Sequence, residues 1–358
     1  MTNRQHWISK GELTKTKWVT AQDAPLAEGH IRLSVDAFAI TANNVTYAAF
    51  GGAPMHYWNF FPTSDNAWGR VPVWGFATVA QSNVDGVDPG KRVYGYFPIS
   101  DTLDVEAVRV SPAGFMDGAA HRAELAPIYN TYFFTDTDPA YAADFEPQQM
   151  LFRPLYATGW WLADTLVDAV KSPPKAAVLS SASSKTACAL AHGLKSRGGV
   201  KTIGLTSQRN TAFVERTGLY DEVVTYDGVA TLESADPTAF VDFLGSPEMT
   251  LAVHTALGDA LTRSLVVGAT DWDADRTPLP LPGPTPEFFF VPDVAAARVK
   301  EAGPSLMAKM AEDLMAFYPA SQAFVEPVLS KGTDAIDTVW SDSVAGTVPA
   351  DKGHVVSL

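Results

Sequence analysis

Cysteine, positive charge and long apolar runs are all scarce in this sequence. Its 358 residues include a single cysteine, Cys188, which excludes an intrachain disulfide framework and a zinc site built from several cysteines. Lys and Arg number 26 against 40 Asp and Glu, and the net charge of −14 disfavours nucleic acid and anionic membrane surfaces as partners. No run of about 18 apolar residues occurs, and residues 1–10 hold no apolar signal core. We therefore expect a cytoplasmic protein that acts on neither nucleic acid nor membrane.

The composition is that of a soluble globular chain, with 46% apolar and 18% charged residues, and the length suits two domains. Residues 1–150 contain short alternating or apolar runs separated by turn-forming residues, which predicts a β-rich domain. Residues 151–318 alternate apolar runs with helical patterns, which predicts an α/β domain with a doubly wound parallel sheet. Residues 319–358 return to strand and loop and are too few for a domain, so we expect them to complete the first one.

Residues 176–204 are the most informative stretch. An apolar run (176–179) enters a serine-rich loop, and a helical pattern and a second apolar run (202–205) follow. This β-loop-α-β order is typical of the Rossmann unit, which binds a dinucleotide at the helix N-terminus. The loop has no glycine, so it is either a phosphate cradle of small residues or only a capped helix start. In the first interpretation the phosphate-binding residues are Ser181, Ser183, Ser184 and Lys185.

Two further strand ends extend this prediction. The run 202–205 is followed by Thr206-Ser207-Gln208-Arg209-Asn210, which lacks the acidic residue that holds the ribose hydroxyls in NAD sites. Ser207 and Arg209 instead suit a 2′-phosphate, because guanidinium matches phosphate geometry, and this favours NADP as cofactor. The alternative for Arg209 is a solvated side chain in a turn.

The strand predicted at 264–268 ends at the same sheet edge, so we expect Gly268 and Thr270 to contact the cofactor as well. His254 precedes this strand in a helical pattern. We interpret it as a buried, hydrogen-bonded helix residue rather than as a ligand-binding group. A further strand is predicted at 288–291, and a long helical pattern at 294–317 is expected to break at Gly303-Pro304.

Two aromatic-rich stretches of the first domain, 50–68 and 128–141, follow neither a strand nor a helix pattern. Aromatic side chains in such stretches either line a ligand site or fill core beneath long loops, and both interpretations stay open. The substrate-binding candidates are Tyr57, Trp58, Tyr129, Tyr132 and Trp272.

Three segments in this order resemble the medium-chain dehydrogenase/reductase superfamily. The first is 42–51, in which an Asn and a Tyr precede a Gly. The second joins 75–79 and 87–95, which together read "GxxxV…GxRVxG". The third is 156–160. Within that superfamily the chain is most similar to the zinc-free quinone-oxidoreductase-like branch, and to a bacterial group of uncharacterised function. Lys91 stands where the family has Asp, and Ser181, Ser184 and Ala187 replace the glycines of its phosphate loop. The cysteine ligands of zinc-binding members are missing.

The resemblance implies a GroES-like β-rich catalytic domain, 1–150 with 319–358, and a Rossmann domain, 151–318. It further implies an NADP-dependent, zinc-independent oxidoreductase acting on an activated C=C or C=O bond of a small apolar or aromatic molecule. Tyr47 falls on the family tyrosine near the nicotinamide and is expected to donate a proton, or merely to wall the site. Asn43 and Asn44 are expected to orient a carbonyl. Family analogy suggests a homodimer joined through the strand 288–291. Two alternatives remain: the same fold used without net redox, as a lyase or isomerase, and a non-enzymatic protein that binds a small molecule.

Overall fold

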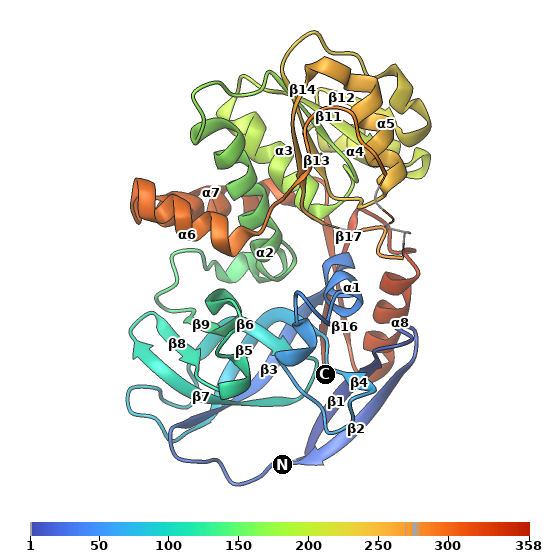
Figure 1. Cartoon of the computed structure of the whole chain (residues 1–358). Coiled ribbons are helices and arrows are strands. Elements are labelled where there is room, and N and C mark those ends of the chain that lie inside the picture. The colour runs from blue at the N-terminus through green and yellow to red at the C-terminus, as the bar shows by residue number, and fades with distance from the viewer. Residues whose placement is uncertain (1, 269, 274–276, 278) are drawn as a thin grey trace. The chain divides into compact units, whose positions relative to one another are not determined.

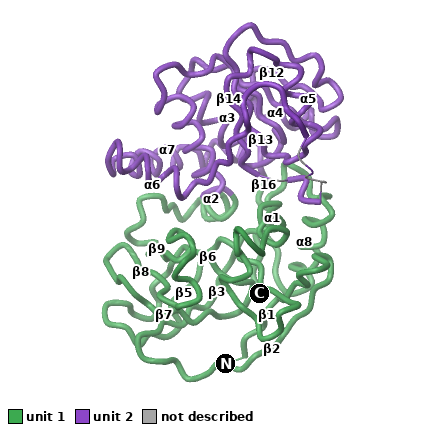
Figure 2. Tube along the Cα trace, viewed as in Figure 1, with its two compact units in different colours: residues 1–151, 326–358 green, residues 152–325 purple. Residues whose placement is uncertain are grey.

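The computed structural model describes residues 2–268, 270–273, 277 and 279–358 (Figure 1). The chain divides into two compact units: unit 1 is Met1–Leu151 with Glu326–Leu358, and unit 2 is Phe152–Val325 (Figure 2). The sequence places the second boundary at residue 318, but helix α7 (Ser305–Ser321) continues past it and the chain re-enters unit 1 at Glu326. The long helical pattern therefore belongs wholly to unit 2.

Within the described residues, unit 1 is built around an eight-stranded sheet with strand order β16-β17-β3-β5-β6-β9-β8-β7. Strand β3 also pairs with β7, so the strands from β3 round to β7 close into an antiparallel barrel. This is the β-rich domain that the sequence predicts. The strands are β3 (His30–Ile40), β5 (Pro72–Ser82), β6 (Arg92–Pro98), β7 (Thr102–Ser111), β8 (Gly114–Asp117), β9 (Thr131–Phe134), β16 (Glu326–Lys331) and β17 (Lys352–Ser357).

The described residues of unit 1 also form a small sheet and, among others, the helices α1 and α8. The sheet has the order β2-β1-β4, formed by β1 (Thr2–Ser9), β2 (Thr16–Gln22) and β4 (Trp68–Gly69). Helix α1 (Ala42–Ala49) follows β3, and helix α8 (Thr333–Val344) lies between β16 and β17. The prediction that residues 319–358 contain only strand and loop is therefore wrong. Helix α8 buries Ile336, Val339 and Trp340 at i, i+3 and i+4, a helical period that the sequence reading overlooked.

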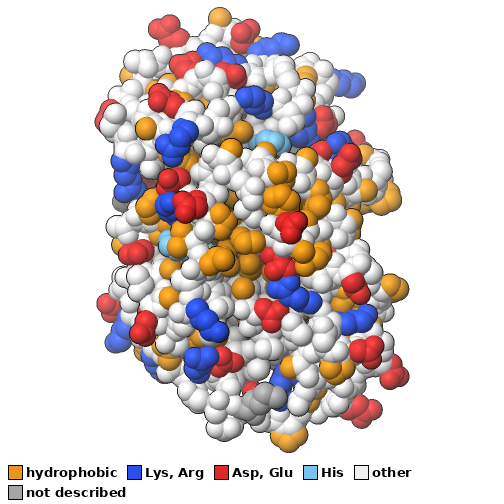
Figure 3. Space-filling model, turned by 180° about the vertical axis from the view of Figure 1, so that it is seen from behind, with side chains coloured by type: hydrophobic (Ala, Val, Ile, Leu, Met, Phe, Trp, Pro, Cys, Tyr) orange, Lys and Arg blue, Asp and Glu red, His pale blue; other side chains and the backbone are white. Residues whose placement is uncertain are grey.

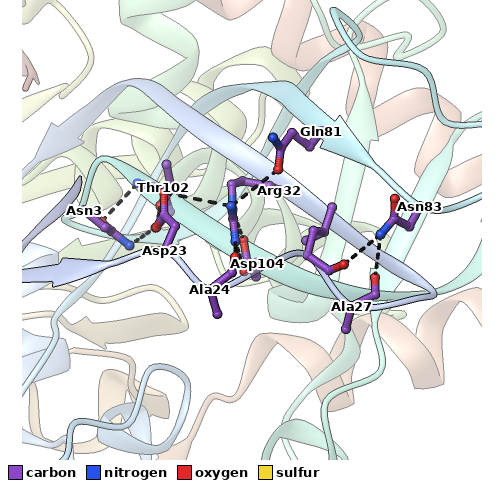
Figure 4. Close-up of polar contacts among 10 residues, drawn as sticks. Asn3, Asp23, Ala24, Ala27, Arg32, Gln81, Asn83, Thr102 and Asp104 are labelled. Atoms are coloured by element: carbon purple, nitrogen blue, oxygen red, sulfur yellow. Dashed lines mark hydrogen bonds and ion pairs between the residues drawn. The ribbon is translucent and has the colours of Figure 1, made fainter. Parts of the chain in front are cut away.

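A buried arginine ties the barrel to the chain segment that enters β3 (Figure 4). Arg32 is 4% exposed, and its guanidinium donates to the two carboxylate oxygens of Asp104 at 2.7 and 2.6 Å. The same group donates to the Ala24 carbonyl at 2.8 Å. Thr102 donates to Asp23 at 3.1 Å, which holds the other side of the incoming segment. The network therefore stabilises the barrel, because each acceptor named here is a group of the protein and not of a ligand.

Within its described residues, unit 2 contains a six-stranded parallel sheet with strand order β12-β11-β10-β13-β14-β15. Counted in chain order within the unit, this is 3-2-1-4-5-6, the doubly wound Rossmann order. All four residues of β10 are buried, as expected for a central parallel strand. The strands are β10 (Ala176–Leu179), β11 (Lys201–Thr206), β12 (Glu222–Thr225), β13 (Thr238–Asp242), β14 (Leu261–Val266) and β15 (Glu287–Phe288).

Helices precede, separate and follow these strands, as the alternating pattern predicts. They are α2 (Glu146–Ala163), α3 (Lys185–Arg197), α4 (Thr211–Thr217), α5 (Pro247–Leu257), α6 (Val291–Ala302) and α7. Helix α6 ends at Gly303, whose φ of +95° suits glycine, and α7 begins after Pro304, so the predicted break is confirmed. The strand predicted at 288–291 is shorter than expected, because α6 already begins at Val291 with a proline in its first turn.

Charged side chains of both signs are interspersed on the face of the molecule seen in Figure 3. Such mixing spreads the net charge of −14 over the surface. Among the described residues, no helix is both long enough and apolar enough to cross a membrane.

Candidate functional site

The carboxyl ends of β10 and β13 meet at the point where the strand order of unit 2 reverses, and ligands of open α/β sheets bind there. Ser180, directly after β10, joins the two strands. Its hydroxyl donates to Asp242 Oδ1 at 2.6 Å and accepts from the backbone N–H groups of Phe243 and Leu244 at 2.8 and 3.0 Å. The loop after β10 is therefore fixed to the end of β13.

Asp242 is a buried carboxylate at this junction, with 2% exposure. Its Oδ1 accepts from the N–H groups of Leu244 and Gly245 at 2.9 and 3.2 Å, and its Oδ2 from the Thr250 hydroxyl at 3.3 Å. Burial raises the pKa of Asp242, although the hydrogen bonds that the carboxylate accepts act in the opposite direction. All of these donors belong to the chain, so Asp242 shapes the turn after β13 rather than offering a free carboxylate.

Ser181 takes the backbone conformation that glycine normally supplies in a dinucleotide loop. Its φ is +48°, in the left-handed region that few residues other than glycine adopt. Its Oγ lies 2.9 Å from Thr270 Oγ1, and the Thr270 N–H donates to the Phe243 carbonyl at 3.0 Å. Two predicted cofactor residues, Ser181 and Thr270, are thus brought together across the switch point. Gly268, predicted with them, donates from its backbone N–H to the Asp242 carbonyl at 3.4 Å.

Ser184 caps the start of α3. Its hydroxyl accepts from the Ala187 N–H at 3.3 Å, which is an ordinary N-cap bond. The Ser183 hydroxyl accepts from Asn210 Nδ2 at 3.0 Å, so the loop after β10 is joined to the segment after β11. Lys185 is the first residue of the helix. Four predicted cofactor residues, 181 and 183–185, therefore lie on one short loop and helix start.

Gly204 on β11 lets the serine-rich loop lie close to the sheet. A Cβ at this position would stand 2.9 Å from Ala182 Cβ and 2.9 Å from Tyr220 Cδ1. The Tyr220 hydroxyl donates to the Ala182 carbonyl at 2.8 Å and so holds the loop from the side of β12. The glycine that is missing from the loop itself is thus present on the neighbouring strand, where close approach of two backbones requires it.

The end of β11 contains two buried hydroxyls that have no hydrogen-bond partner in the described part of the chain, Thr206 Oγ1 and Ser207 Oγ. Thr206 is 1% exposed. A buried hydroxyl normally finds a partner, so two unsatisfied ones in succession indicate a polar ligand or bound water. Arg209 is exposed on the short helical turn η6 (Gln208–Asn210) that follows. Thr206, Ser207 and Arg209, the three residues predicted from this strand end, therefore follow one another closely at the carboxyl end of β11.

His254 is a structural residue, as the sequence analysis expects. It is fully buried, and its Nδ1 lies 2.8 Å from the Pro282 carbonyl while its Nε2 lies 2.9 Å from Ser264 Oγ. Because a carbonyl can only accept, Nδ1 carries the proton and Nε2 accepts from the serine hydroxyl. The interpretation as a buried, hydrogen-bonded helix residue is confirmed.

Unit 1 contains a second candidate region, a group of four tyrosines that we call the tyrosine cluster: Tyr47, Tyr57, Tyr96 and Tyr129. The rings of Tyr47 and Tyr57 lie 4.5 Å apart between centroids, those of Tyr96 and Tyr129 4.9 Å, and those of Tyr47 and Tyr96 5.8 Å. They come from helix α1, from the turn η1 (Tyr57–Asn59), from β6 and from the turn η3 (Pro127–Asn130). Three predicted site residues are therefore neighbours within one unit.

Trp74 and Phe60 complete this cluster. The Trp74 ring lies 4.9 Å from that of Tyr96 and 5.9 Å from that of Tyr129, and its Nε1–H donates to the Tyr47 hydroxyl oxygen at 3.4 Å. Phe60 packs edge-on against Tyr96 at 5.2 Å. Tyr96 is fully buried. The cluster thus combines an apolar surround with several hydroxyl donors.

Burial raises the pKa of all four phenols, which therefore stay protonated near neutral pH. Their hydrogen bonds differ in direction. At Tyr47, hydrogen bonds from Trp74, Asn43, Tyr96 and Tyr129 oppose the effect of burial and lower the pKa. At Tyr129, the hydrogen bonds with Tyr57 and Tyr47 raise it further. At Tyr57, the hydrogen bond with Tyr129 also lowers the pKa. Neighbouring hydrogen bonds therefore favour the anions of Tyr47 and Tyr57, and Tyr47 has more of these bonds.

The contacts of Asn44 do not support its predicted role in orienting a substrate carbonyl. Its Oδ1 accepts from the Thr41 backbone N–H at 2.7 Å and from the Thr41 hydroxyl at 3.2 Å, and its Nδ2 donates to the Pro72 carbonyl at 2.9 Å. This is a helix cap extended to the neighbouring strand, in a residue that is 3% exposed. Asn44 fixes helix α1, and Asn43 is the asparagine in hydrogen-bond contact with Tyr47.

Trp58 and Tyr132, both predicted to bind substrate, have other surroundings. Trp58 packs between Gly51 and Gly69, where a Cβ on either glycine would come within 2.2 Å of the indole. Tyr132 is fully buried, donates to the Tyr96 carbonyl at 3.0 Å and lies 3.3 Å from Arg122 Nη1. Trp272, the remaining substrate candidate, is half-buried in the turn after Thr270 and belongs to unit 2.

The family described as "Protein of unknown function (DUF2855)" matches residues 38–349, which is most of the chain. The protein belongs to this family. No curated protein matches the sequence significantly.

Solved structures similar to this DUF2855 protein are enzymes of the medium-chain dehydrogenase/reductase kind. CurA from Vibrio vulnificus, solved alone and in complex with NADPH, is 13% identical with a TM-score of 0.64 over 99% of this chain and 98% of CurA. A mutant form of enoyl thioester reductase from Candida tropicalis is 12% identical, with a TM-score of 0.57 over 100% of each chain. A thermostable alcohol dehydrogenase from Pyrobaculum aerophilum is 13% identical, with a TM-score of 0.59 over 100% of each chain. At this identity the likeness shows the fold.

Sequence reasoning missed three residues of the DUF2855 protein that the geometry makes prominent: Trp74, Tyr96 and Arg122. Tyr94 and Tyr96 alternate in one predicted strand, and Trp74 lies in another strand pattern. Trp74 and Tyr96 are cross-strand partners, so aromatic residues in two neighbouring strand patterns were a signal that could have predicted this contact. Arg122 had no local signal, because its partners lie on other elements. The described residues contain no group of three or more His, Cys, Asp or Glu side chains placed to hold a metal ion.

Proposed function

We propose that this DUF2855 protein is an NADP-dependent, zinc-independent oxidoreductase that transfers hydride between nicotinamide and an activated C=C or C=O bond of a small apolar or aromatic molecule. The proposal is supported by the Rossmann strand order of unit 2 and by the fold shared with reductases and dehydrogenases. One of those structures contains NADPH. The observation that carries the proposal is the pair of buried, unpartnered hydroxyls of Thr206 and Ser207 at the end of β11.

The residues of unit 2 fit a dinucleotide in three respects. Ser181 supplies the left-handed turn after β10 without a glycine, and Gly204 supplies the close packing beside it. The N-terminus of α3 follows the loop directly and offers backbone N–H groups and the positive end of the helix dipole to a pyrophosphate. Thr206 Oγ1 and Ser207 Oγ are hydroxyls that a ribose or its phosphate would satisfy.

The preference for NADP is proposed from Ser207 and Arg209. The segment 206–210 has no carboxylate to take two ribose hydroxyls, whereas a guanidinium next to a serine hydroxyl suits a 2′-phosphate. Arg209 lies exposed on the turn that directly follows Ser207. The other predicted contacts, Ser183, Ser184, Lys185, Gly268 and Thr270, are proposed to hold the remainder of the cofactor.

The experiment that tests this preference is Arg209→Ala, with NADPH and NADH titrated in parallel by fluorescence or calorimetry. Loss of a charge-assisted bond to phosphate is worth about 1.5–3 kcal/mol, so NADPH should bind roughly 10- to 100-fold more weakly while NADH is unchanged. Arg216→Ala, which removes an exposed arginine from the next helix, is the matched control. An equal loss of affinity for NADPH and NADH in R209A would contradict the assignment of Arg209 to the 2′-phosphate.

In unit 1, Tyr47 is proposed as the proton donor of the reaction. When bound, NADPH supplies the hydride, and the protein supplies orientation and a proton. Tyr47 is 5% exposed, stays protonated near neutral pH, and is surrounded by hydrogen-bond donors that stabilise its anion after the proton has left. Tyr57, whose ring is tilted against that of Tyr47, and Tyr129, whose ring lies edge-on to that of Tyr57, are proposed to contact the substrate.

Tyr47→Phe tests this role because it removes one hydroxyl and keeps the ring. We expect kcat for NADPH oxidation, measured over a panel of enones, quinones and ketones, to fall by about 10²- to 10⁴-fold with NADPH affinity unchanged. Tyr141→Phe is the control, since the Tyr141 hydroxyl bonds Glu146 outside the cluster. Full activity of Y47F would assign Tyr47 to the wall of the site instead.

Zinc independence is proposed from the state of the one thiol in the sequence. Cys188 is 1% exposed, its thiol faces the Ala182 carbonyl at 3.5 Å, and burial raises its pKa to about 12. A thiol held protonated in this way is a poor zinc ligand, because zinc takes the thiolate. Turnover that resists strong chelators is the expected result. NADPH binding without turnover over the whole panel would instead favour a lyase, an isomerase or a binding protein.

A further inference from the structure

Trp74 makes a directional contact with Tyr47. The indole Nε1–H, in a side chain that is 7% exposed, donates to the Tyr47 hydroxyl oxygen at 3.4 Å. An indole nitrogen can only donate. The Tyr47 oxygen is therefore the acceptor of this bond, and the proton of the Tyr47 hydroxyl has to point elsewhere.

Two further features hold the pair in this geometry. Asn44 Nδ2, one turn before Tyr47 on helix α1, donates to the carbonyl of Pro72, two residues before Trp74 on β5, at 2.9 Å. The Trp74 ring is also clamped by neighbouring tyrosine rings, stacked on Tyr94 at 5.6 Å with an interplanar angle of 17° and tilted against Tyr96 at 4.9 Å. The helix that carries the phenol and the strand that carries the indole are thus fixed to each other.

We propose that Trp74 is a positioning residue for Tyr47: its indole N–H holds the phenol oxygen as an acceptor, directs the hydroxyl proton toward the substrate, and stabilises the phenolate that remains. This rests on the proposed role of Tyr47 as proton donor. In the step itself the O–H bond of Tyr47 breaks, its electron pair stays on the phenol oxygen, and the proton bonds to the carbon or oxygen of the substrate that has gained electrons. Water afterwards returns a proton to the phenolate.

Asn43, Tyr96 and Tyr129 also hydrogen-bond Tyr47, so the indole N–H is one of several groups that act on its oxygen. Tyr57, Tyr96 and Tyr129 are the titratable groups that face it, and burial raises the pKa of each, so they remain neutral where Tyr47 acts. The charged side chain of Arg122 lies over the ring of Phe60, and its charge lowers the pKa of Tyr96 and Tyr132. Asn43 contributes an amide donor to the Tyr47 oxygen but is only half-buried, whereas the indole N–H is shielded from water.

The test compares the titration of residue 47 in the presence and absence of the indole N–H. A fluorinated tyrosine is placed at position 47 to bring its ionisation into an accessible pH range, and its ¹⁹F chemical shift is followed against pH in otherwise unchanged protein, in Trp74→Phe and in Trp340→Phe. Trp340 is a matched control, because it is buried and its Nε1–H bonds the Leu13 carbonyl far from the cluster. Neither cofactor nor substrate is needed, so failure of the proposed function leaves this readout intact.

We expect the midpoint for residue 47 to rise by about one pH unit in W74F, as for loss of one hydrogen bond to a phenolate, and to stay in place in W340F. In the active enzyme, W74F should lower kcat about tenfold while the dissociation constant of NADPH is unchanged. An unchanged or lowered midpoint in W74F would overturn the proposal. If W74F does not fold, benzothienylalanine at position 74 keeps the ring shape and removes only the N–H. The same change in the pH dependence of kcat is then expected, and a profile like that of the parent protein would refute the proposal.

Discussion

Arg122 offers the sharpest test of how unit 1 is held together. Its side chain is 1% exposed, and it lies over the rings of Phe60 and Phe61, with the guanidinium carbon 5.4 and 5.1 Å from their centroids. Nη1 donates to Asp117 Oδ2 at 2.6 Å, and Nη2 to the Tyr129 carbonyl at 2.7 Å. One buried cation therefore neutralises one buried carboxylate and also anchors the turn that carries Tyr129.

Replacing this arginine with methionine keeps much of the apolar stem and removes the charge. The Asp117 side chain is only 4% exposed, so R122M leaves an uncompensated buried carboxylate, and breaking such a pair costs about 3–5 kcal/mol in the free energy of unfolding. Adding Asp117→Asn should restore part of this loss, because the amide can still accept from the Ala119 N–H, which now lies 2.9 Å from Asp117 Oδ1, without carrying a charge.

Scanning calorimetry and urea unfolding of the parent protein, R122M and D117N/R122M provide the assay. Six of the tryptophans belong to unit 1, so their fluorescence reports mainly the transition of interest: Trp7, Trp18, Trp58, Trp68, Trp74 and Trp340. If the free energy of unfolding of R122M lies within about 1 kcal/mol of that of the parent protein, the reasoning is refuted, because a surface ion pair contributes no more than this. A double variant no more stable than R122M would refute it equally, since the cost would then not arise from the stranded carboxylate.

Two further predictions concern pH and assembly. The hydrogen bonds from His6 and Trp18 hold the pKa of Asp337 below its ordinary value, so their stabilisation is present above the unfolded pKa of about 3.9 and is lost as the pH falls through the folded pKa. The melting temperature of D337N should therefore lie below that of the parent protein at pH 7 and converge with it in acid; an equal gap at pH 3 and pH 7 would contradict this. We also propose a homodimer through β15, where Phe288 is 65% exposed and stacks on Phe290 at 6.4 Å. Light scattering should show a dimer for the parent protein and for Leu329→Asp, on an edge strand of unit 1, but a monomer for Phe288→Asp; a monomeric parent protein would exclude the proposal.

The regular alternation of residues 151–318 made the sheet of unit 2 predictable. Each predicted strand there contains an apolar run bounded by turn formers, and the helices between them begin and end at recognisable caps such as Ser184 and Gly218. The serine-rich loop was placed correctly for the same reason. Its decisive feature, the positive φ of Ser181, has no signal in the sequence, because serine seldom adopts that conformation and only the surrounding contacts impose it.

The tyrosine cluster was only partly predictable. Tyr57 and Tyr129 stood out as aromatic residues without a strand or helix period, and Tyr47 through the family resemblance. Which of these residues touch depends on pairs far apart in the sequence. The cap formed by Asn44 shows the limit most clearly. A short run such as 42–49 has too few helical markers to identify α1, and without the helix the cap on Thr41 and the bond to Pro72 are not visible.

The measurement that tests the central claim most directly is a calorimetric titration of the parent protein with NADPH and, separately, with NADH. We expect one nucleotide bound per chain, with NADPH bound more tightly than NADH, because Arg209 and the hydroxyls of Thr206 and Ser207 receive the 2′-phosphate and ribose. Absence of binding by either nucleotide at millimolar concentration would contradict it.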